Sequence, residues 1–199
     1  MFEKIKRQVV IKCYKILKPY IEKEFLSNEQ FKTLTNNNFN LNKNLSIGAN
    51  SYIDNSVVFR TYNNDKIIIG NNTSINYGVC IMTYGGTIEI GEFCDINPYT
   101  IIYGHGGTKI GNRVLIAGHC MIIPNNHNFA DKNVPIINQG NTSKGIVIED
   151  DVWIGHACSI LDGVTIGKGS IIGAGSVVTT SIPEYSICTG IPGKVIRKR

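Results

Sequence analysis

The stretch Ile148–Pro183, IEDDVW IGHACS ILDGVT IGKGSI IGAGSV VTTSIP, repeats with a period of six residues. Each block opens on an aliphatic residue, and its fifth residue is small or short. A period of six fits neither the α-helical turn nor the simple alternation of an isolated strand. It is typical of a solenoid in which three blocks form one triangular coil of 18 residues. The block-opening residues that would fill its core are Ile148, Ile154, Ile160, Ile166, Ile172 and Val178.

The same blocks can be aligned through most of the chain, with coils that start at Ile47, Ile69, Ile90, Ile110, Ile148 and Ile166. The starts are separated by 22, 21, 20, 38 and 18 residues, so the fourth coil carries a long insertion. Long insertions in a compact fold are usually functional or disordered. This one contains a His, aromatic and aliphatic residues and two prolines, which favours an ordered functional loop. The expected fold class is therefore all-β, a parallel β-helix of about six triangular coils with an extruded loop.

Three regions are expected along the chain. Residues 1–44 would form a helical segment and a polar linker, residues 45–183 the β-helix with its loop at 124–147, and residues 184–199 a basic tail. Within the first region, residues 2–26 carry apolar residues at helical spacing among many lysines. This predicts a helix packed on the solenoid or on a neighbouring subunit, with contact to an anionic membrane surface as the alternative.

Composition narrows the class of protein further. No apolar run is long enough to cross a membrane, and no secretory cleavage site follows the N-terminus. The formal net charge of +5 comes largely from the two ends, which argues against a nucleic-acid-binding face. No cysteine pair has the C-x-x-C spacing of a zinc site, and Cys94, Cys120 and Cys158 fall at inward fifth positions. They are expected as buried thiols. The chain is expected in the cytoplasm, close to a membrane if the N-terminal helix contacts one, and without a metal.

Three motifs carry a family resemblance: DVWIG at Asp151–Gly155, GVTIGKGSIIGAGSVV at Gly163–Val178, and GIPGKVIRKR at the C-terminus. They resemble the hexapeptide-repeat acyltransferases, most closely the sugar and xenobiotic O-acetyltransferase branch, over about residues 45–199. The resemblance implies a left-handed β-helix, which reverses the usual right-handed crossover. It also implies a homotrimer with active sites between adjacent prisms, and acetyl-CoA as the acyl donor.

The resemblance also points to two residues that would act on the acceptor. His127, in NNHNF, matches the position of the family's catalytic base, and Asn97 matches a position that contacts the acceptor. A neutral imidazole can take the proton of a sugar hydroxyl as that hydroxyl attacks a thioester. A surface histidine and a corner asparagine are the structural alternatives. The γ-carbonic anhydrases share this fold and bind zinc with three histidines, but no third histidine completes their pattern beside His119 and His127.

For CoA, the resemblance points to small residues along the backbone and to basic residues near the C-terminus. The candidates are Trp153, Gly155, His156, Ala174, Thr179, Lys194 and Arg197. Small residues would let the pantetheine arm lie against the backbone, and the basic residues would meet the phosphates. Trp153 should point outward, toward a subunit interface or the cofactor. Thr180 stands where many relatives carry Lys, which shifts phosphate binding toward Lys168 or the tail.

The resemblance thus implies O-acetylation of a saccharide hydroxyl, in a surface polysaccharide or its sugar precursor. Direct transfer is favoured, because no Cys or Ser stands out as a nucleophile. Two alternatives stay open: a xenobiotic acetyltransferase acting on streptogramins or chloramphenicol, and an N-acetyltransferase acting on an amino sugar. A non-enzymatic solenoid is disfavoured, because the hexads show no Thr-x-Thr ladder of the ice-binding kind.

Overall fold

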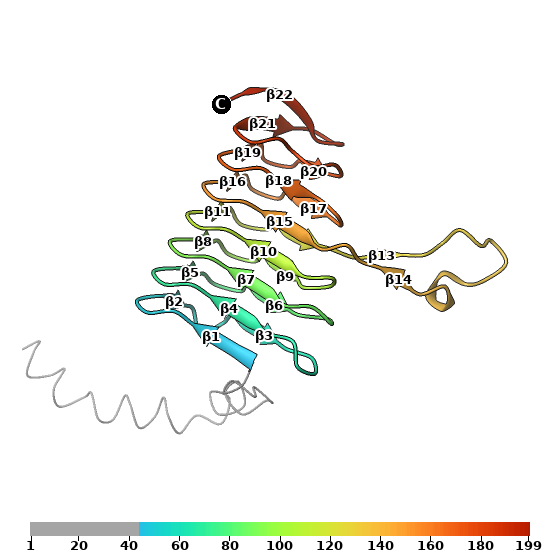
Figure 1. Ribbon diagram of the computed structural model, residues 1–199, viewed down its shortest axis with the longest axis horizontal. Helices are drawn as coiled ribbons and strands as arrows, with labels where there is room; N and C mark the ends of the chain where they lie inside the picture. Colours follow the sequence, from blue (N-terminus) through green and yellow to red (C-terminus); the bar gives the residue numbers. More distant parts are fainter. Residues whose placement is uncertain (1–43) are drawn as a thin grey trace, which may run out of the picture. The chain divides into compact units, whose positions relative to one another are not determined.

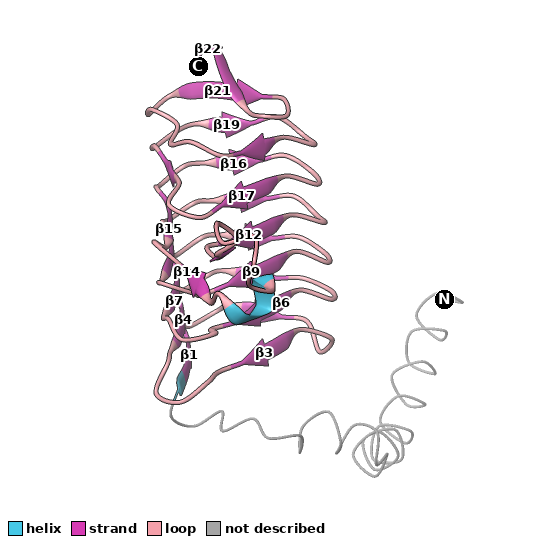
Figure 2. Cartoon of the chain, turned by 90° about the vertical axis from the view of Figure 1, so that its right-hand side faces the viewer, coloured by secondary structure: helices cyan, strands magenta, loops and turns pink. Residues whose placement is uncertain are grey.

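A computed structural model describes residues 44–199, so the helix expected over residues 2–26 lies outside the described part of the chain. The described residues form a three-sided β-helix, in which strands of successive coils stack into parallel sheets (Figure 1). Most strands are two or three residues long and are joined by tight corners (Figure 2). The expected all-β solenoid with an extruded loop is confirmed.

Each side of the solenoid is one sheet. Sheet A contains β1 (Leu45–Ile47), β4 (Ile67–Ile69), β7 (Ile88–Ile90), β10 (Thr108–Ile110), β15 (Ile146–Ile148) and β18 (Thr165–Ile166). Sheet B contains β2 (Tyr52–Ile53), β5 (Ser74–Ile75), β8 (Asp95–Ile96), β11 (Leu115–Ile116), β16 (Trp153–Ile154), β19 (Ile171–Ile172), β21 (Ser186–Thr189) and β22 (Lys194–Lys198). Sheet C contains β3 (Val58–Arg60), β6 (Cys80–Met82), β9 (Ile101–Tyr103), β12 (Met121–Ile123), β17 (Ser159–Leu161) and β20 (Val177–Val178). The loop holds β13 (Asn126–His127), the 3-10 helix η1 (Ile136–Asn138) and β14 (Asn141–Thr142).

The core is built from the residues that open each block. All six of these residues in the stretch from Ile148 onward are fully buried. They stack in register from coil to coil, with Ile154 opposite Ile172 and Ile160 opposite Val178. Burying one such side chain stabilises the fold by about 1.5–3 kcal/mol. The core register predicted from the hexads is therefore confirmed.

Fifth-position side chains point inward and tie neighbouring coils together. The Sγ of Cys94 donates to the carbonyl oxygen of Gly111, and the Sγ of Cys120 donates to that of Gly155, both at 3.1 Å. The hydroxyl of Thr73 makes the equivalent bond to the next coil. These positions accept small donors because the corner leaves one backbone carbonyl to be satisfied in the interior. The cysteines at these positions are buried free thiols, as expected.

Variation in coil length is concentrated at the corner between sheets C and A. The turns at residues 61–66, 83–87 and 104–107 all lie there and shorten from coil to coil. The loop leaves the prism at this same C–A corner, after β12, and returns at β15 (Figure 1). The corner between sheets B and C keeps one turn length throughout. The irregular parts of the described chain therefore line one edge of the solenoid.

The segment after Pro183 continues the solenoid into a partial seventh coil. Ile182 forms a parallel bridge to Ile166, and β21 pairs in parallel with β19. Gly167 occupies the position of Pro183 in the preceding coil, and its N–H donates to the carbonyl oxygen of Ile182 at 2.8 Å. Pro183 fits in the last coil because no further coil follows it to receive such a bond. The chain then turns back, and β22 pairs antiparallel with β21.

Candidate functional site

The loop leaves the prism on a two-stranded neck formed by β13 and β14, and β13 carries His127. Asp162, from the next coil, anchors both legs of this neck. Its carboxylate accepts hydrogen bonds from Asn126 Nδ2 at 3.0 Å and from the backbone N–H groups of Lys144 at 2.6 Å and Gly145 at 3.1 Å. His127 is therefore an exposed imidazole on an anchored part of the loop.

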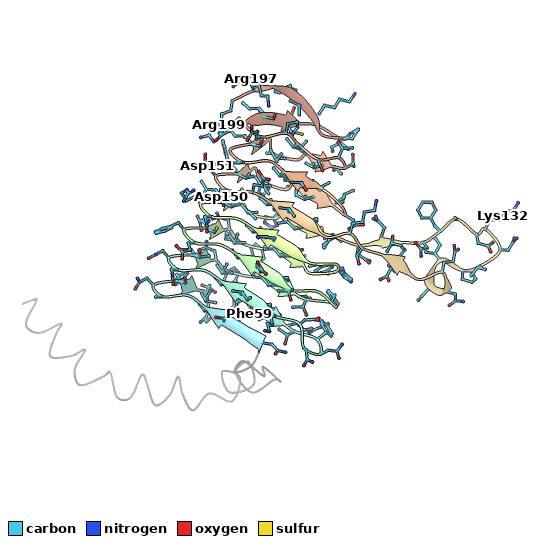
Figure 3. The ribbon with its side chains drawn as sticks, in the orientation of Figure 1. Phe59, Lys132, Asp150, Asp151, Arg197 and Arg199 are labelled. Atoms are coloured by element: carbon cyan, nitrogen blue, oxygen red, sulfur yellow. The ribbon has the colours of Figure 1, made fainter. Side chains whose placement is uncertain are left out.

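Beyond the neck, the loop projects away from the prism, with Lys132 at its far end (Figure 3). The side-chain amide of Gln139 closes the tip by donating to the carbonyl oxygen of Asp131 at 2.8 Å. Two apolar side chains of the tip are strongly exposed, Phe129 at 75% and Ile137 at 85%. The tip is thus held together by its own hydrogen bonds, while its apolar side chains are left uncovered by the described chain.

A column of rings climbs the C–A corner and ends beside the neck. Tyr62 stacks on Tyr84 with centroids 4.9 Å apart, and Tyr84 stacks on His105 at 4.9 Å and 16°. Tyr103 meets Tyr84 edge-on at 4.8 Å. Burial lowers the pKa of His105, and nearby His127 lowers it further. Both effects favour the neutral form of the His105 imidazole over the charged form.

A second column follows the B–C corner, on the opposite edge of sheet C. Tyr77 meets Tyr99 edge-on at 5.3 Å, Tyr99 stacks on His119 at 5.1 Å, and His119 meets His156 edge-on at 5.3 Å. Tyr99 and His119 both hold left-handed backbone, with φ of 61° and 60°. Bulky residues rarely adopt that conformation. The column leads to His156, one of the predicted CoA contacts.

The two predicted acceptor residues do not meet within one chain. Asn97 follows β8 at the B–C corner, whereas His127 lies on the neck at the C–A corner, with sheet C between them. The Nδ2 of Asn97 donates to Asp95 Oδ2 at 3.2 Å and to the carbonyl oxygen of Ile116 at 3.1 Å. Asn97 is thus a corner asparagine that also bonds the next coil.

Three of the predicted CoA residues lie together on the B–C corner of the two coils after the loop. A Cβ at Gly155 would lie 2.6 Å from the backbone nitrogen of Ala174, so the two coils leave no room there for a side chain. His156 and Ala174 are exposed on the same ridge. Lys194 opens β22, in the hairpin that caps this end of the solenoid. Thr179 lies apart from them, at the C–A corner, after β20.

The other two predicted CoA residues belong to sheet B. Trp153 points outward as expected, with 52% of its surface exposed, and lies in register between Leu115 and Ile171. Arg197 is exposed on β22 and lies at the C-terminal end of the prism (Figure 3). Neither residue lies at the neck that carries His127.

A hollow of about 450 Å³ lies over sheet A, where the returning leg of the neck rejoins the prism. Its polar lining includes Glu89, Lys109, Lys144 and Thr165. The leg packs tightly at this point, since a Cβ on Gly145 would lie 2.7 Å from the carbonyl oxygen of Gly107. Within residues 44–199, no group of three His, Cys, Asp or Glu side chains is arranged for a metal ion. In the same range, no helix has the length and hydrophobicity to cross a bilayer.

The comparisons with known proteins agree with this architecture. The family described as bacterial transferase hexapeptide (six repeats) matches residues 145–180. Rv3034c of Mycobacterium tuberculosis, named as an acetyltransferase, is 36% identical over 131 residues, which cover 66% of this chain and 42% of that protein. This chain therefore spans less than half of the mycobacterial protein. WbbJ of Escherichia coli, named for O-acetyl transfer in lipopolysaccharide biosynthesis, is 32% identical over 144 residues, covering 68% of this chain and 74% of WbbJ.

Among solved structures, AntD of Bacillus cereus superposes with a TM-score of 0.69 at 26% identity, over 87% of this chain and 89% of AntD. AntD is named as an N-acyltransferase, and that structure contains dTDP-4-amino-4,6-dideoxyglucose and coenzyme A. The hexad register, the fold and these matches all point the same way. The chain therefore belongs to the family of bacterial hexapeptide-repeat acyltransferases.

Proposed function

We propose that the protein is an acetyl-CoA-dependent O-acetyltransferase that modifies a saccharide hydroxyl in the cytoplasm. Family membership and the likeness to WbbJ support the reaction class. One structural observation carries the proposal: an exposed His127 is held on a neck that Asp162 anchors to the prism. A histidine in a flexible insertion would not give the fixed geometry that proton transfer needs.

In the proposed reaction, His127 removes the proton of the acceptor hydroxyl as its oxygen attacks the thioester carbonyl of acetyl-CoA. The tetrahedral oxyanion is stabilised by a backbone N–H group. The carbon–sulfur bond then breaks, the acetyl group stays on the acceptor oxygen, and the CoA thiolate takes up the proton from His127. Asn97 positions the acceptor. No acyl-enzyme forms on this route.

The proposed site is shared between subunits of a homotrimer. Asn97 and the CoA-binding B–C corner lie across sheet C from His127, so a second prism must bring them to the neck. The outward ladder of sheet C supports such packing, because Val58, Cys80 and Ile101 follow one another on it and are only partly exposed. The exposed apolar tip of the loop offers further surface to a neighbour.

N-acylation of an amino sugar is the second candidate, because AntD is named as an N-acyltransferase and holds an amino sugar nucleotide. The same base would serve, since an ammonium group must also lose a proton before it attacks. The acceptor decides between the two. Hydroxyl-only sugars would be acetylated under the first proposal, and only amino sugars under the second.

The test is CoA release from acetyl-CoA with a panel of acceptors: maltose, lactose, UDP-N-acetylglucosamine, dTDP-4-amino-4,6-dideoxyglucose and chloramphenicol. His127→Ala should lower kcat by about 10²–10⁴ with the best acceptor. The thermal shift produced by CoA should stay the same, because that imidazole is not proposed to hold CoA. Lys132→Ala serves as the control, because it truncates an exposed side chain at the far end of the same loop. Near-normal turnover by the His127 variant would refute the assignment of the base.

A further inference from the structure

Two buried polar atoms at the base of the neck have no hydrogen-bond partner, Nδ1 of His105 and Oδ1 of Asn125. They belong to adjacent coils. Met121 pairs with Ile101 in neighbouring strands. Asn125 follows Met121 by the same number of residues as His105 follows Ile101, so the two residues occupy equivalent positions at the C–A corner. Proteins leave few buried polar groups unpaired, and each one calls for an explanation.

The packing of His105 indicates which of its nitrogens carries the proton. The ring is held against Tyr84 at 4.9 Å and 16°, with Tyr103 at 5.9 Å on another side. A proton on the sealed Nδ1 would be a buried donor without a partner, which costs about 1–3 kcal/mol. Unpaired buried N–H groups are rarer than underused acceptors. The proton therefore sits on Nε2, the nitrogen that is open to solvent, and the ring presents an N–H donor outward.

Both legs of the neck start at this corner. The outgoing leg starts at Asn125, two residues before His127. The returning leg packs on the neighbour of His105, since a Cβ on Gly106 would lie 2.9 Å from the nitrogen of Gly145. His105 is thus an outward-facing donor at the foot of the element that carries the proposed base.

We propose that His105 binds the acceptor saccharide, with its Nε2–H donating to a sugar oxygen next to the hydroxyl that His127 deprotonates. This rests on the proposed function and adds a second imidazole to the acceptor site. The two rings have different roles: His105 donates a hydrogen bond, and His127 accepts a proton. The stack on Tyr84 holds the donor in place. Sugar hydroxyl oxygens are suitable acceptors for such a neutral N–H group.

The kinetic test compares His105→Phe, which keeps a ring against Tyr84 but removes the donor, with His105→Gln, which keeps a donor. The control is Tyr62→Phe, which removes a polar group from the same ring column and keeps the ring stacked on Tyr84. With the best acceptor of the panel, the His105→Phe variant should raise the acceptor KM about fivefold to tenfold, with CoA affinity and Tm unchanged. His105→Gln should recover most of the loss. Unchanged acceptor KM in His105→Phe, or an equal loss of CoA affinity, would overturn the proposal.

A second measurement needs no acceptor. Nitrogen-15 spectra of the imidazoles in the full-length protein at pH 7, assigned with the His105→Gln variant, report the tautomer directly. The expected result is the neutral Nε2–H form. A proton on Nδ1, or a charged ring, would overturn the proposal. If no acceptor in the panel releases CoA, the proposed function fails, and these spectra alone decide on the donor at His105.

Discussion

Removal of the Asp162 carboxylate should release the neck and disable the proposed base without unfolding the solenoid. Its two bonds to backbone N–H groups, at 2.6 Å and 3.1 Å, hold the returning leg against the prism. Hydrogen bonds to a charged group contribute about 1.5–3 kcal/mol each. At the lower value for this half-buried carboxylate, two bonds amount to about 3 kcal/mol, which is about a hundredfold in the equilibrium between attached and detached neck.

Amide hydrogen exchange measures this detachment at the two donors. In Asp162→Ala, the N–H groups of Lys144 and Gly145 should exchange about a hundredfold faster than in the parent, and kcat should fall with little change in Tm. Asp162→Asn keeps one acceptor oxygen and should lie in between. The control is Asp131→Ala, which removes a carboxylate that accepts from Asn133 N–H in the loop tip, away from the neck. Unchanged exchange at Lys144 and Gly145 would refute the anchoring role of Asp162.

Three further outcomes follow from the structure. Gly167→Ala should destabilise the fold by about 1–3 kcal/mol in a denaturant titration, because its Cβ would meet the backbone nitrogen of Glu184; wild-type stability would mean that the last coil is not packed as described. Ile160→Ala, in the core, should cost about 2–5 kcal/mol, and a cost below 1 kcal/mol would contradict its full burial. Lys194→Ala should weaken CoA binding about threefold to tenfold, with a smaller effect at high salt, whereas Lys132→Ala at the loop tip should not; equal effects of the two would exclude Lys194 as a phosphate contact.

The hexads predict the core and the position of the loop, because an inward position in a narrow solenoid tolerates few side chains. Ile148, Cys158 and Val178 are buried as their block positions require. The last coil escaped prediction for a physical reason. A proline that closes the last block, as Pro183 does, signals the end of a strand in most settings. In the terminal coil that signal does not apply, because its missing N–H has no coil above to bond.

The candidate site was harder to predict, since block positions say which side of the prism a residue occupies but not what lies beside it. The sequence predicts His127 and Asn97 as site residues. Only the fold shows that they lie on opposite edges of sheet C. His105 was not singled out from the sequence. A usable signal exists in the aromatic spacing, because Tyr62, Tyr84 and His105 recur at the length of one coil.

The reversal of direction at β22 also affects whether copies of the molecule can associate end to end. Every parallel rung of a solenoid is a template for another, so an uncovered last rung invites end-to-end growth into filaments. Here the next strand, β22, runs antiparallel to β21 and carries Lys194, Arg197 and Lys198. A second copy that approached this end would therefore meet positive charge and a strand that runs in the opposite direction. Terminal caps of this kind are what repetitive folds need for solubility. A chain cut before Lys194 would present Ser186–Thr189 as a bare edge, open to the next molecule.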